Sequence, residues 1–302
     1  MIEELLVRQM VEDGYLSSVL AQYGGEPAVF YQKAPMDEDV NWSGSSFPRL
    51  QFNLDFSFDP ERKQAGTLTV DIWACTVNET EDGGNLDRAI AQRLEEIISG
   101  VFYTPKTGNT LCAVWENSVA YMRKAADLNS EISPVETYGI AVTFDLIAFP
   151  TQDSFQPDPI SALQSFAKEV FPSWKVIGLE ELPEIWKPRD SEPALYWRMA
   201  GAEMTREIFS CTWYLGQFFG HISCETVEAR NRCARGILEV LRGRQDLLLE
   251  DGSFLRLTKS KFHHDGNPLS QGQIALWGEF GVLASRYVDL CEDEILNHGY
   301  LN

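Results

Sequence analysis

Residues 48–77 read PRLQFNLDFSFDPERKQAGTLTVDIWACTV. Large apolar side chains occupy every second position in both halves of this stretch, a period of two that is typical of half-buried β-strands. The segment DPERKQAG between them is rich in charge and contains Pro and Gly, which favours a turn. The stretch therefore predicts an antiparallel hairpin. One face of its first strand would carry Leu50, Phe52, Leu54, Phe56 and Phe58, and one face of its second strand Leu68, Val70, Ile72 and Ala74.

Helix and strand patterns surround this hairpin. Apolar residues at helical spacing predict a helix at the N-terminus and another over residues 79–100, which ends at Gly100. Strand patterns follow at 110–118 and 136–149. One helix crossing several antiparallel strands indicates an α+β domain, with a sheet on one side and helices on the other.

The pattern begins again after residue 160. The stretch PTQDSFQPDPI, which starts at Pro150, holds three prolines and no apolar period, so we expect a linker over residues 151–160. The elements expected beyond it are a helix at 160–171, a strand at 193–198, a strand pair at 207–224 with a turn near Gly216, a helix at 226–243, a hairpin at 247–260 around Asp251-Gly252, and a closing strand at 272–285.

These two series of elements favour an α+β fold of two similar domains, each an antiparallel sheet packed against helices. The domains are expected at residues 1–150 and at residues 161–302, the second with a C-terminal tail. Three pairs of segments resemble each other in the same order: PAVFYQ (27–32) and PALYWR (193–198), residues 87–100 and 230–243, and YGIAVTF (138–144) and GQIALWG (272–278). The shared order predicts a tandem duplication. Two unrelated domains with a similar order of elements remain the alternative.

The offsets between these segments differ. The short strand matches at an offset of 166 positions and the helix at 143, so the second copy would be 23 residues shorter between them. This predicts that the stretch 33–49 belongs to the first copy only. The stretch, within YQKAPMDEDVNWSGSSFPR, carries a cluster of acids and one Trp in polar surroundings. The candidate partner-contact residues are Asp37, Glu38, Asp39 and Trp42. The Trp42 ring can either pack on its own domain or anchor a partner. We predict an interaction arm or lumen-facing loop with Trp42 as its anchor, so that Trp42→Ala would leave folding nearly intact and weaken assembly.

The composition and net charge of the chain argue against several classes of function. The chain has 302 residues, 44% of them hydrophobic, and a formal net charge of −20. Such an acidic surface argues against binding to nucleic-acid phosphates, which needs basic patches, and equally against anionic membranes. No basic segment followed by an apolar run opens the chain, so we expect a cytoplasmic protein. Its six cysteines form no CxxC pair and are expected to be free thiols.

No catalytic motif is present. The sequence lacks a Gly-rich phosphate loop and a GxSxG nucleophile elbow. His263 and His264, next to Asp265, are the best metal candidates, but no further ligand is spaced to join them. We therefore expect no catalytic residue, no cofactor and no metal, and the chain is not expected to be an enzyme.

The first domain resembles the tail terminator (tail completion) proteins of long-tailed bacteriophages. The resemblance lies in VFYQKAP (29–35), the loop from Asp37 to Trp42, FPRLQFNLDF (47–56) and the helix from Asn85 to Gly100, and it covers residues 1–150. The second domain resembles the family only through the repeat. Most family members have a single domain, so the tandem pair is a departure that leaves the subunit count open.

The resemblance implies a structural virion protein that self-associates into a ring, expected to be six-fold. Such a ring caps the tail tube, and its partners would be the tail tube protein and a neck or head connector protein. DNA would pass through its lumen without specific binding, and no membrane would be involved. The protein would be assembled in the host cytoplasm and reside in the virion tail or neck. The alternatives are another neck, head–tail adaptor or baseplate component, or an enzyme of unrecognised type.

Overall fold

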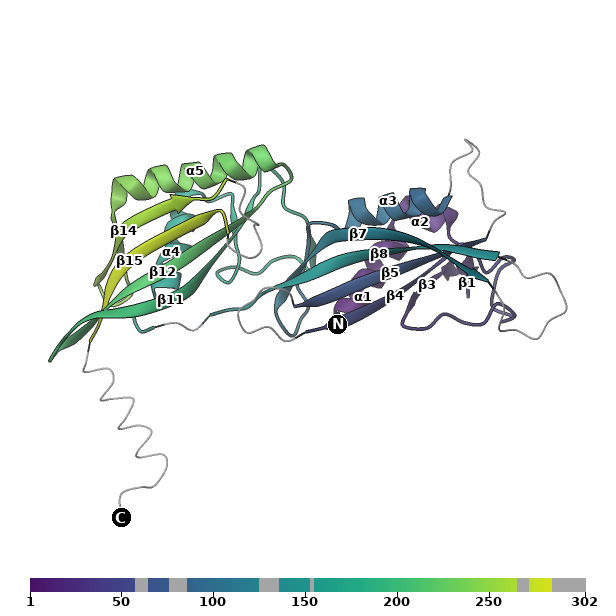
Figure 1. Ribbon diagram of the computed structural model, residues 1–302, viewed down its shortest axis with the longest axis horizontal. Helices are drawn as coiled ribbons and strands as arrows, with labels where there is room; N and C mark the ends of the chain where they lie inside the picture. Colours follow the sequence, from purple (N-terminus) through teal and green to yellow (C-terminus); the bar gives the residue numbers. More distant parts are fainter. Residues whose placement is uncertain (58–64, 76–85, 125–135, 153–154, 265–271, 284–302) are drawn as a thin grey trace, which may run out of the picture. The chain divides into compact units, whose positions relative to one another are not determined.

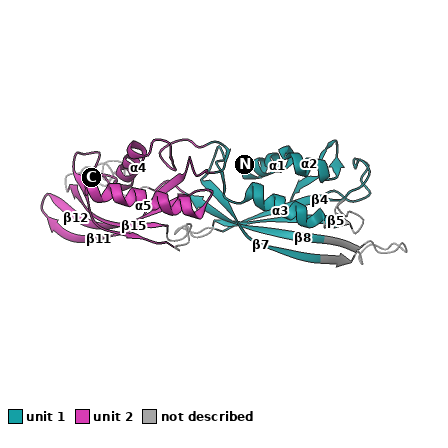
Figure 2. Cartoon of the chain, turned by 90° about the horizontal axis from the view of Figure 1, so that it is seen from above, with its two compact units in different colours: residues 1–149, 183–187 teal, residues 150–182, 188–302 magenta. Residues whose placement is uncertain are grey.

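The computed structural model divides the chain into two units (Figure 2). Unit 1 consists of Met1–Phe149 and Pro183–Lys187, and unit 2 of Pro150–Leu182 and Pro188–Asn302. The chain therefore passes between the two units three times. The residues that the structure describes are 1–57, 65–75, 86–124, 136–152, 155–264 and 272–283.

Unit 1 is a seven-stranded sheet with helices on one face (Figures 1 and 2). Along the sheet the order is β10-β6-β7-β8-β5-β4-β3, and every pair is antiparallel except the parallel pair of β3 and β4. A two-stranded hairpin, β1–β2, is separate from this sheet. The elements are α1 (Ile2–Glu12), α2 (Gly14–Val19), β1 (Gln22–Tyr23), β2 (Glu26–Pro27), β3 (Val29–Tyr31), β4 (Arg49–Phe56), β5 (Gly66–Cys75), α3 (Leu86–Ile98), β6 (Val101–Tyr103), β7 (Thr110–Lys124), β8 (Glu136–Phe149) and β10 (Ile185–Trp186).

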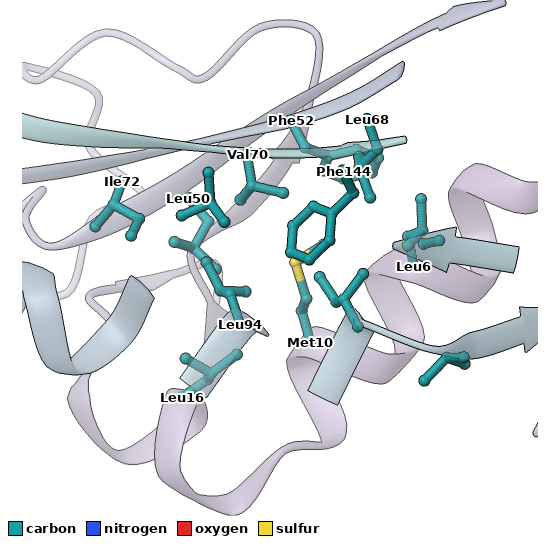
Figure 3. Close-up of a cluster of buried hydrophobic side chains, with 14 of the residues drawn as sticks. Leu6, Met10, Leu16, Leu50, Phe52, Leu68, Val70, Ile72, Leu94 and Phe144 are labelled. Carbon is teal, nitrogen blue, oxygen red and sulfur yellow. The ribbon is translucent and has the colours of Figure 1, made fainter. Parts of the chain in front are cut away.

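The core of unit 1 lies between the sheet and its helices. The predicted hairpin is confirmed as β4 and β5, and its alternation places Leu50, Phe52 and Val70 in this core without exposed surface (Figure 3). Leu6 and Met10 meet them from α1. Burying each of these side chains contributes about 1.5–3 kcal/mol. The period of two in the sequence is thus the direct cause of the sheet's one apolar face.

Asp13 links the three helices of unit 1. Its carboxylate caps α2 by accepting from the backbone N–H of Leu16 at 3.0 Å, and it accepts from Arg93 of α3 at 2.7 Å. Partial burial disfavours the charged carboxylate, but these hydrogen bonds outweigh it and lower the pKa of Asp13 below its ordinary value. The carboxylate therefore stabilises the packing of α1, α2 and α3 while it is ionised.

Unit 2 is a six-stranded sheet in the order β13-β14-β15-β12-β11-β9, with α4 and α5 on one face. All pairs are antiparallel except the parallel pair of β9 and β11. Its core includes Leu163, Trp197, Phe218, Ile237 and Phe280. The elements are α4 (Pro159–Val170), β9 (Lys175–Val176), β11 (Ala194–Ile208), β12 (Cys211–Ser223), α5 (Val227–Arg244), β13 (Asp246–Leu248), β14 (Phe254–Phe262) and β15 (Ile274–Leu283).

The two sheets repeat one order of strands. From β6 onward the sheet of unit 1 has the order β6-β7-β8-β5-β4-β3, and the sheet of unit 2 has the corresponding order β13-β14-β15-β12-β11-β9. In both, the pair at the end of this series is parallel, β4 with β3 and β11 with β9, and the other pairs are antiparallel. The helix pair 87–100 and 230–243 and the closing strands occupy equivalent places, as α3 and α5 and as β8 and β15. The comparison of 27–32 with 193–198 is wrong, because the first contains β3 and the second begins β11, whose counterpart in the sheet is β4.

This correction changes the comparison of the stretch 33–49. Val29 pairs with Leu50, so 20 residues lie between them, and Val176 pairs with Leu195, which leaves 18. The connection between the two parallel strands is therefore about as long in unit 2 as in unit 1. The expectation that this stretch occurs only in the first half is wrong.

Two further expectations in the second half are wrong. Gly216 is not at a turn but in the middle of β12, where a Cβ would lie 2.6 Å from the Phe218 ring and 3.1 Å from the Phe280 ring. The glycine is needed because these rings fill that space. The stretch 151–160 is not a separate linker, because Pro159 begins α4 and the Phe155 ring lies 4.8 Å from Tyr214.

In the described residues, no helix is long and apolar enough to cross a membrane.

We expect Gly216→Ala to lower the free energy of unfolding by about 1–3 kcal/mol, because the new methyl group overlaps two buried rings. Gly201→Ala on the neighbouring strand β11 is the matched control, since nothing lies within 4 Å of its Cβ position. Urea titration followed by tryptophan fluorescence measures both variants. Equal stability of the two would contradict the packing role of Gly216.

We expect Asp13→Asn to destabilise the protein by about 1–2 kcal/mol at pH 7, because asparagine keeps the cap but loses the charge that pairs with Arg93. Since the folded-state pKa of Asp13 is lowered, this stabilisation is present above the ordinary carboxyl value of about 4 and is lost as the pH falls through the folded value. Denaturation at several pH values should show the gap between the two proteins closing in acid. Glu96→Gln, which removes the exposed partner of Arg93, is expected to change stability by less than about 0.5 kcal/mol.

Candidate partner-binding site

The candidate residues lie in the connection between β3 and β4, residues 32–48, which we call the arm. Its middle runs beside strand β1 of the same unit. The backbone N–H of Gly24 donates to the carbonyl of Asn41, and the N–H of Ser43 donates to the carbonyl of Gln22, both at 3.0 Å. The hairpin β1–β2, which has no counterpart among the described residues of unit 2, therefore supports the arm.

Trp42 packs on its own unit. Its ring lies edge-to-face against Tyr23, with centroids 5.0 Å apart, and against Phe30 at 5.8 Å. The indole N–H donates to the carbonyl of Met36 at 2.8 Å, and the Arg49 guanidinium lies 5.8 Å from the ring centroid. Of the two alternatives for this ring, the structure contains the contact with its own unit, and the ring remains half-buried. The contacts of Trp42 therefore stabilise the conformation of the arm.

The three acids of the arm have different surroundings. Asp37 forms an ion pair with Arg49 at the start of β4. The Asp39 carboxylate accepts from the backbone N–H of Asn41 at 3.0 Å and from its side-chain amide at 2.9 Å, which fixes a tight turn. Glu38 is exposed. The structure thus brings Asp37, Asp39 and Trp42 together in one ordered loop and leaves Glu38 directed to solvent.

Two residues that the sequence pattern did not single out are the most exposed apolar ones of the arm. Met36 is 73% exposed and Val40 is 94% exposed. Both are flanked by the acids of the arm, and an apolar residue in an acidic loop is the signal that could have identified them. A loop that half-buries its tryptophan but exposes Met36 and Val40 presents apolar side chains next to charged ones, the usual composition of a protein contact.

A second candidate site is a cleft in which three charged side chains are already paired. A cleft of about 780 Å³ in unit 1 is lined by Arg8, Glu184 and Lys187. Arg8 pairs with Glu184 at 2.8 Å, and the Lys187 ammonium donates to the carbonyl of Glu96 at 2.8 Å. Within the described ranges, no three His, Cys, Asp or Glu side chains are grouped to hold a metal. Asp265 of the histidine cluster lies outside those ranges.

Four of the six cysteines are free thiols, as expected: Cys112, Cys211, Cys224 and Cys233. Cys291 and the side chain of Cys75 lie outside what the structure describes. The thiol of Cys224 is hydrogen-bonded to Cys233, which raises the pKa of Cys224 and lowers that of Cys233, and the Arg232 charge acts in the same direction on Cys233. Cys233 is thus the thiol of this pair that ionises more readily.

Comparison with known proteins gives no match to this chain among family models, curated proteins or solved structures.

We expect Trp42→Ala to lower the free energy of unfolding by about 1–3 kcal/mol, because it removes two aromatic contacts and the indole hydrogen bond that order the arm. Val40→Ala is the matched control and should change stability by less than about 0.5 kcal/mol, since its side chain is almost fully exposed. Thermal unfolding followed by circular dichroism measures both. A Trp42→Ala variant as stable as the control would mean that the ring contributes nothing to its own unit.

Proposed function

We propose that the chain is a structural virion protein that resembles a phage tail terminator, and that copies of it form a ring at the end of the tail tube. The observation that carries this proposal is the repeat of one strand order, with the same single parallel pair, in the two units. We infer a tandem duplication from it. A chain with two copies of one sheet-forming domain is suited to building a closed ring by repeated contacts.

The charge of the chain supports the same function. A formal net charge of −20 gives a ring whose surface repels phosphate, and a lumen that repels phosphate lets DNA slide through, whereas a basic lumen would hold it. The proposed partners are further copies of the chain, the tail tube protein and the neck or head connector protein. The proposed location is the tail or neck of the virion.

If each chain contains two copies of the domain, a ring with six-fold symmetry of domains can be built from two different numbers of chains. Three chains would supply six units in one layer, and six chains would supply twelve. The mass of the 34.1 kDa chain separates these arrangements, because the assembled particles would differ two-fold in mass.

Electron microscopy and mass photometry of the purified chain, with and without isolated tail tubes, test this function. We expect rings of three or six copies, formed in solution or on tube ends, and no retention on double-stranded DNA at physiological salt. A chain that stays monomeric at all concentrations and also fails to bind tail tubes would overturn the proposal. Binding to baseplates instead of tube ends would reassign the protein to another part of the tail.

A further inference from the structure

The sheet of unit 2 has an outer face that lies away from its helices. Helices α4 and α5 pack on the other face (Figure 2). Successive side chains of a strand point to opposite faces, and on β15 the side chains of Leu276 and Phe280 lie in the core beneath the helices. Trp277 and Glu279 therefore lie on the outer face.

A patch of three cations and two aromatic rings lies on this outer face. Lys259 of β14 is the cross-strand neighbour of Trp277, and Arg198 of β11 is that of Phe219 on β12. Phe219 lies diagonally across from Trp277, and Lys261 lies two positions beyond Lys259 on the same face. Four adjacent strands thus contribute to what we call the basic patch, which consists of Lys259, Lys261, Trp277, Phe219 and Arg198.

The two lysines of the basic patch have no acidic partner in the described part of the chain. The Lys259 ammonium lies 4.7 Å from the centroid of the Trp277 ring, and both lysine side chains are exposed. Glu279, which lies on the same face, has Arg256 as its cross-strand neighbour. Like charges as close as those of the two lysines repel each other, so an acidic group placed beside them stabilises the patch.

Carboxylates fit the basic patch better than nucleobases do. Lys259 covers the ring of Trp277, and the Arg198 guanidinium lies 4.9 Å from the centroid of the Phe219 ring, so a base could stack there only by displacing a cation. A carboxylate pairs with the cations where they stand. The net charge of −20 also repels a long polyanion. The patch therefore favours a short acidic peptide.

The sequence that follows β15 is such a peptide. Residues 284–302 read ASRYVDLCEDEILNHGYLN and lie outside the described part of the structure. They hold four acids against one Arg, and three of the acids are consecutive: Glu292, Asp293 and Glu294. Apolar residues stand on both sides of these acids and suit the two rings of the patch. The segment and the patch are thus complementary in charge and composition.

The three acids are close enough in the sequence to reach the patch of their own chain. Strand β15 ends at Leu283, which is about 20 Å from Trp277 at a rise of about 3.3 Å per residue. Glu292 follows Leu283 by nine positions, and a chain of that length spans up to about 30 Å. Attachment to the same strand keeps the local concentration of the acids at roughly millimolar order, so ion pairs that are weak individually are sufficient.

We propose that residues 284–302 bind to the basic patch of the same chain, with their three consecutive acids beside Lys259 and Lys261. The acidic segment thereby neutralises a basic surface of the sheet that would otherwise be open to other anions. An acidic partner protein would have to displace the segment before it could reach this face. The inference is independent of the proposed ring, because it concerns a single chain.

Disulfide trapping in the full-length chain tests this contact. Gln217, the other cross-strand neighbour of Trp277, lies beside the patch, and the native Cys291 directly precedes the three acids. The Gln217→Cys protein is oxidised mildly, and digestion followed by mass spectrometry measures its cross-link to Cys291. Glu239→Cys is the matched control, since Glu239 is exposed on α5, on the opposite face. We expect at least ten-fold more cross-link from Gln217→Cys than from the control, in protein of monomer size.

Charge reversal supplies a second measurement. Lys259→Glu and Lys261→Glu, introduced together into the Gln217→Cys protein, should lower the yield of the cross-link at least five-fold, and so should about 1 M salt. Arg235→Glu with Arg242→Glu is the control with the same net charge and should leave the yield unchanged, because both arginines lie on α5. All four side chains are exposed, so unchanged thermal unfolding is the check on folding.

Four results would overturn the proposal. Equal cross-linking of the Gln217→Cys and Glu239→Cys proteins would mean that the segment does not bind to the outer face. A cross-link found only in covalent dimers would assign the patch to the segment of a second copy. An equal loss of cross-link in the α5 control would remove the role of charge. Retention of the full-length chain on single-stranded DNA that depends on Lys259 and Lys261 would make the patch a nucleic-acid surface. The proposed function is decided separately, by binding to tail tubes.

Discussion

The central pairing of each sheet, β5 with β8 and β12 with β15, is the constraint on which each unit depends. The middle of each sheet consists of two hairpins, β4–β5 with β7–β8 and β11–β12 with β14–β15, and in the described residues this is the strand pairing that joins them. It brings together residues far apart in the sequence, such as Gly66 and Leu146, so a long loop must close before the sheet exists. The helix between the hairpins, α3 or α5, can bury its apolar stripe only once the two are joined.

The edges of the sheets differ more than their centres. Both sheets end at one side with a short parallel strand, β3 or β9, which follows the opening helix of the unit. At the other side, unit 1 gains β10 and unit 2 stops at β13. A fully paired strand in the middle of a sheet tolerates little variation, whereas an edge can accept or lose a strand at small cost to the core. The two sheets therefore share the order of their central strands and differ at this edge.

The sequence was informative where side chains alternate against a single core. Leu68, Val70 and Ile72 predicted both the strand and its buried face, and all three have no exposed surface. The prediction failed where one residue type can have two different structural roles. Gly216 looked like a turn because glycine is common in turns, but its role is to leave room for two rings that come from other positions. Residues 199–208 of β11 are largely exposed on both faces, so no apolar period marks this part of the strand.

The candidate site was predictable only in part. The acids and the tryptophan of the arm were visible in the sequence, and three of the four lie together in the structure. What the sequence could not give is the direction of each side chain, because the partners of Trp42 come from β1 and β3 and no local pattern links them. Strand β10 was missed for a related reason: two residues are too short to show a period.

Because β10 lies within the sequence of the second half, the two units are not separable stretches of the gene. A split after residue 149 would leave the first product without Ile185, which packs on its core, and without Trp186, which covers Phe102. That product would display an unpaired β6 edge, prone to join other chains at random. Because the second half of the chain supplies a strand to a unit that is built mainly from the first half, neither half of the gene alone encodes a complete unit 1.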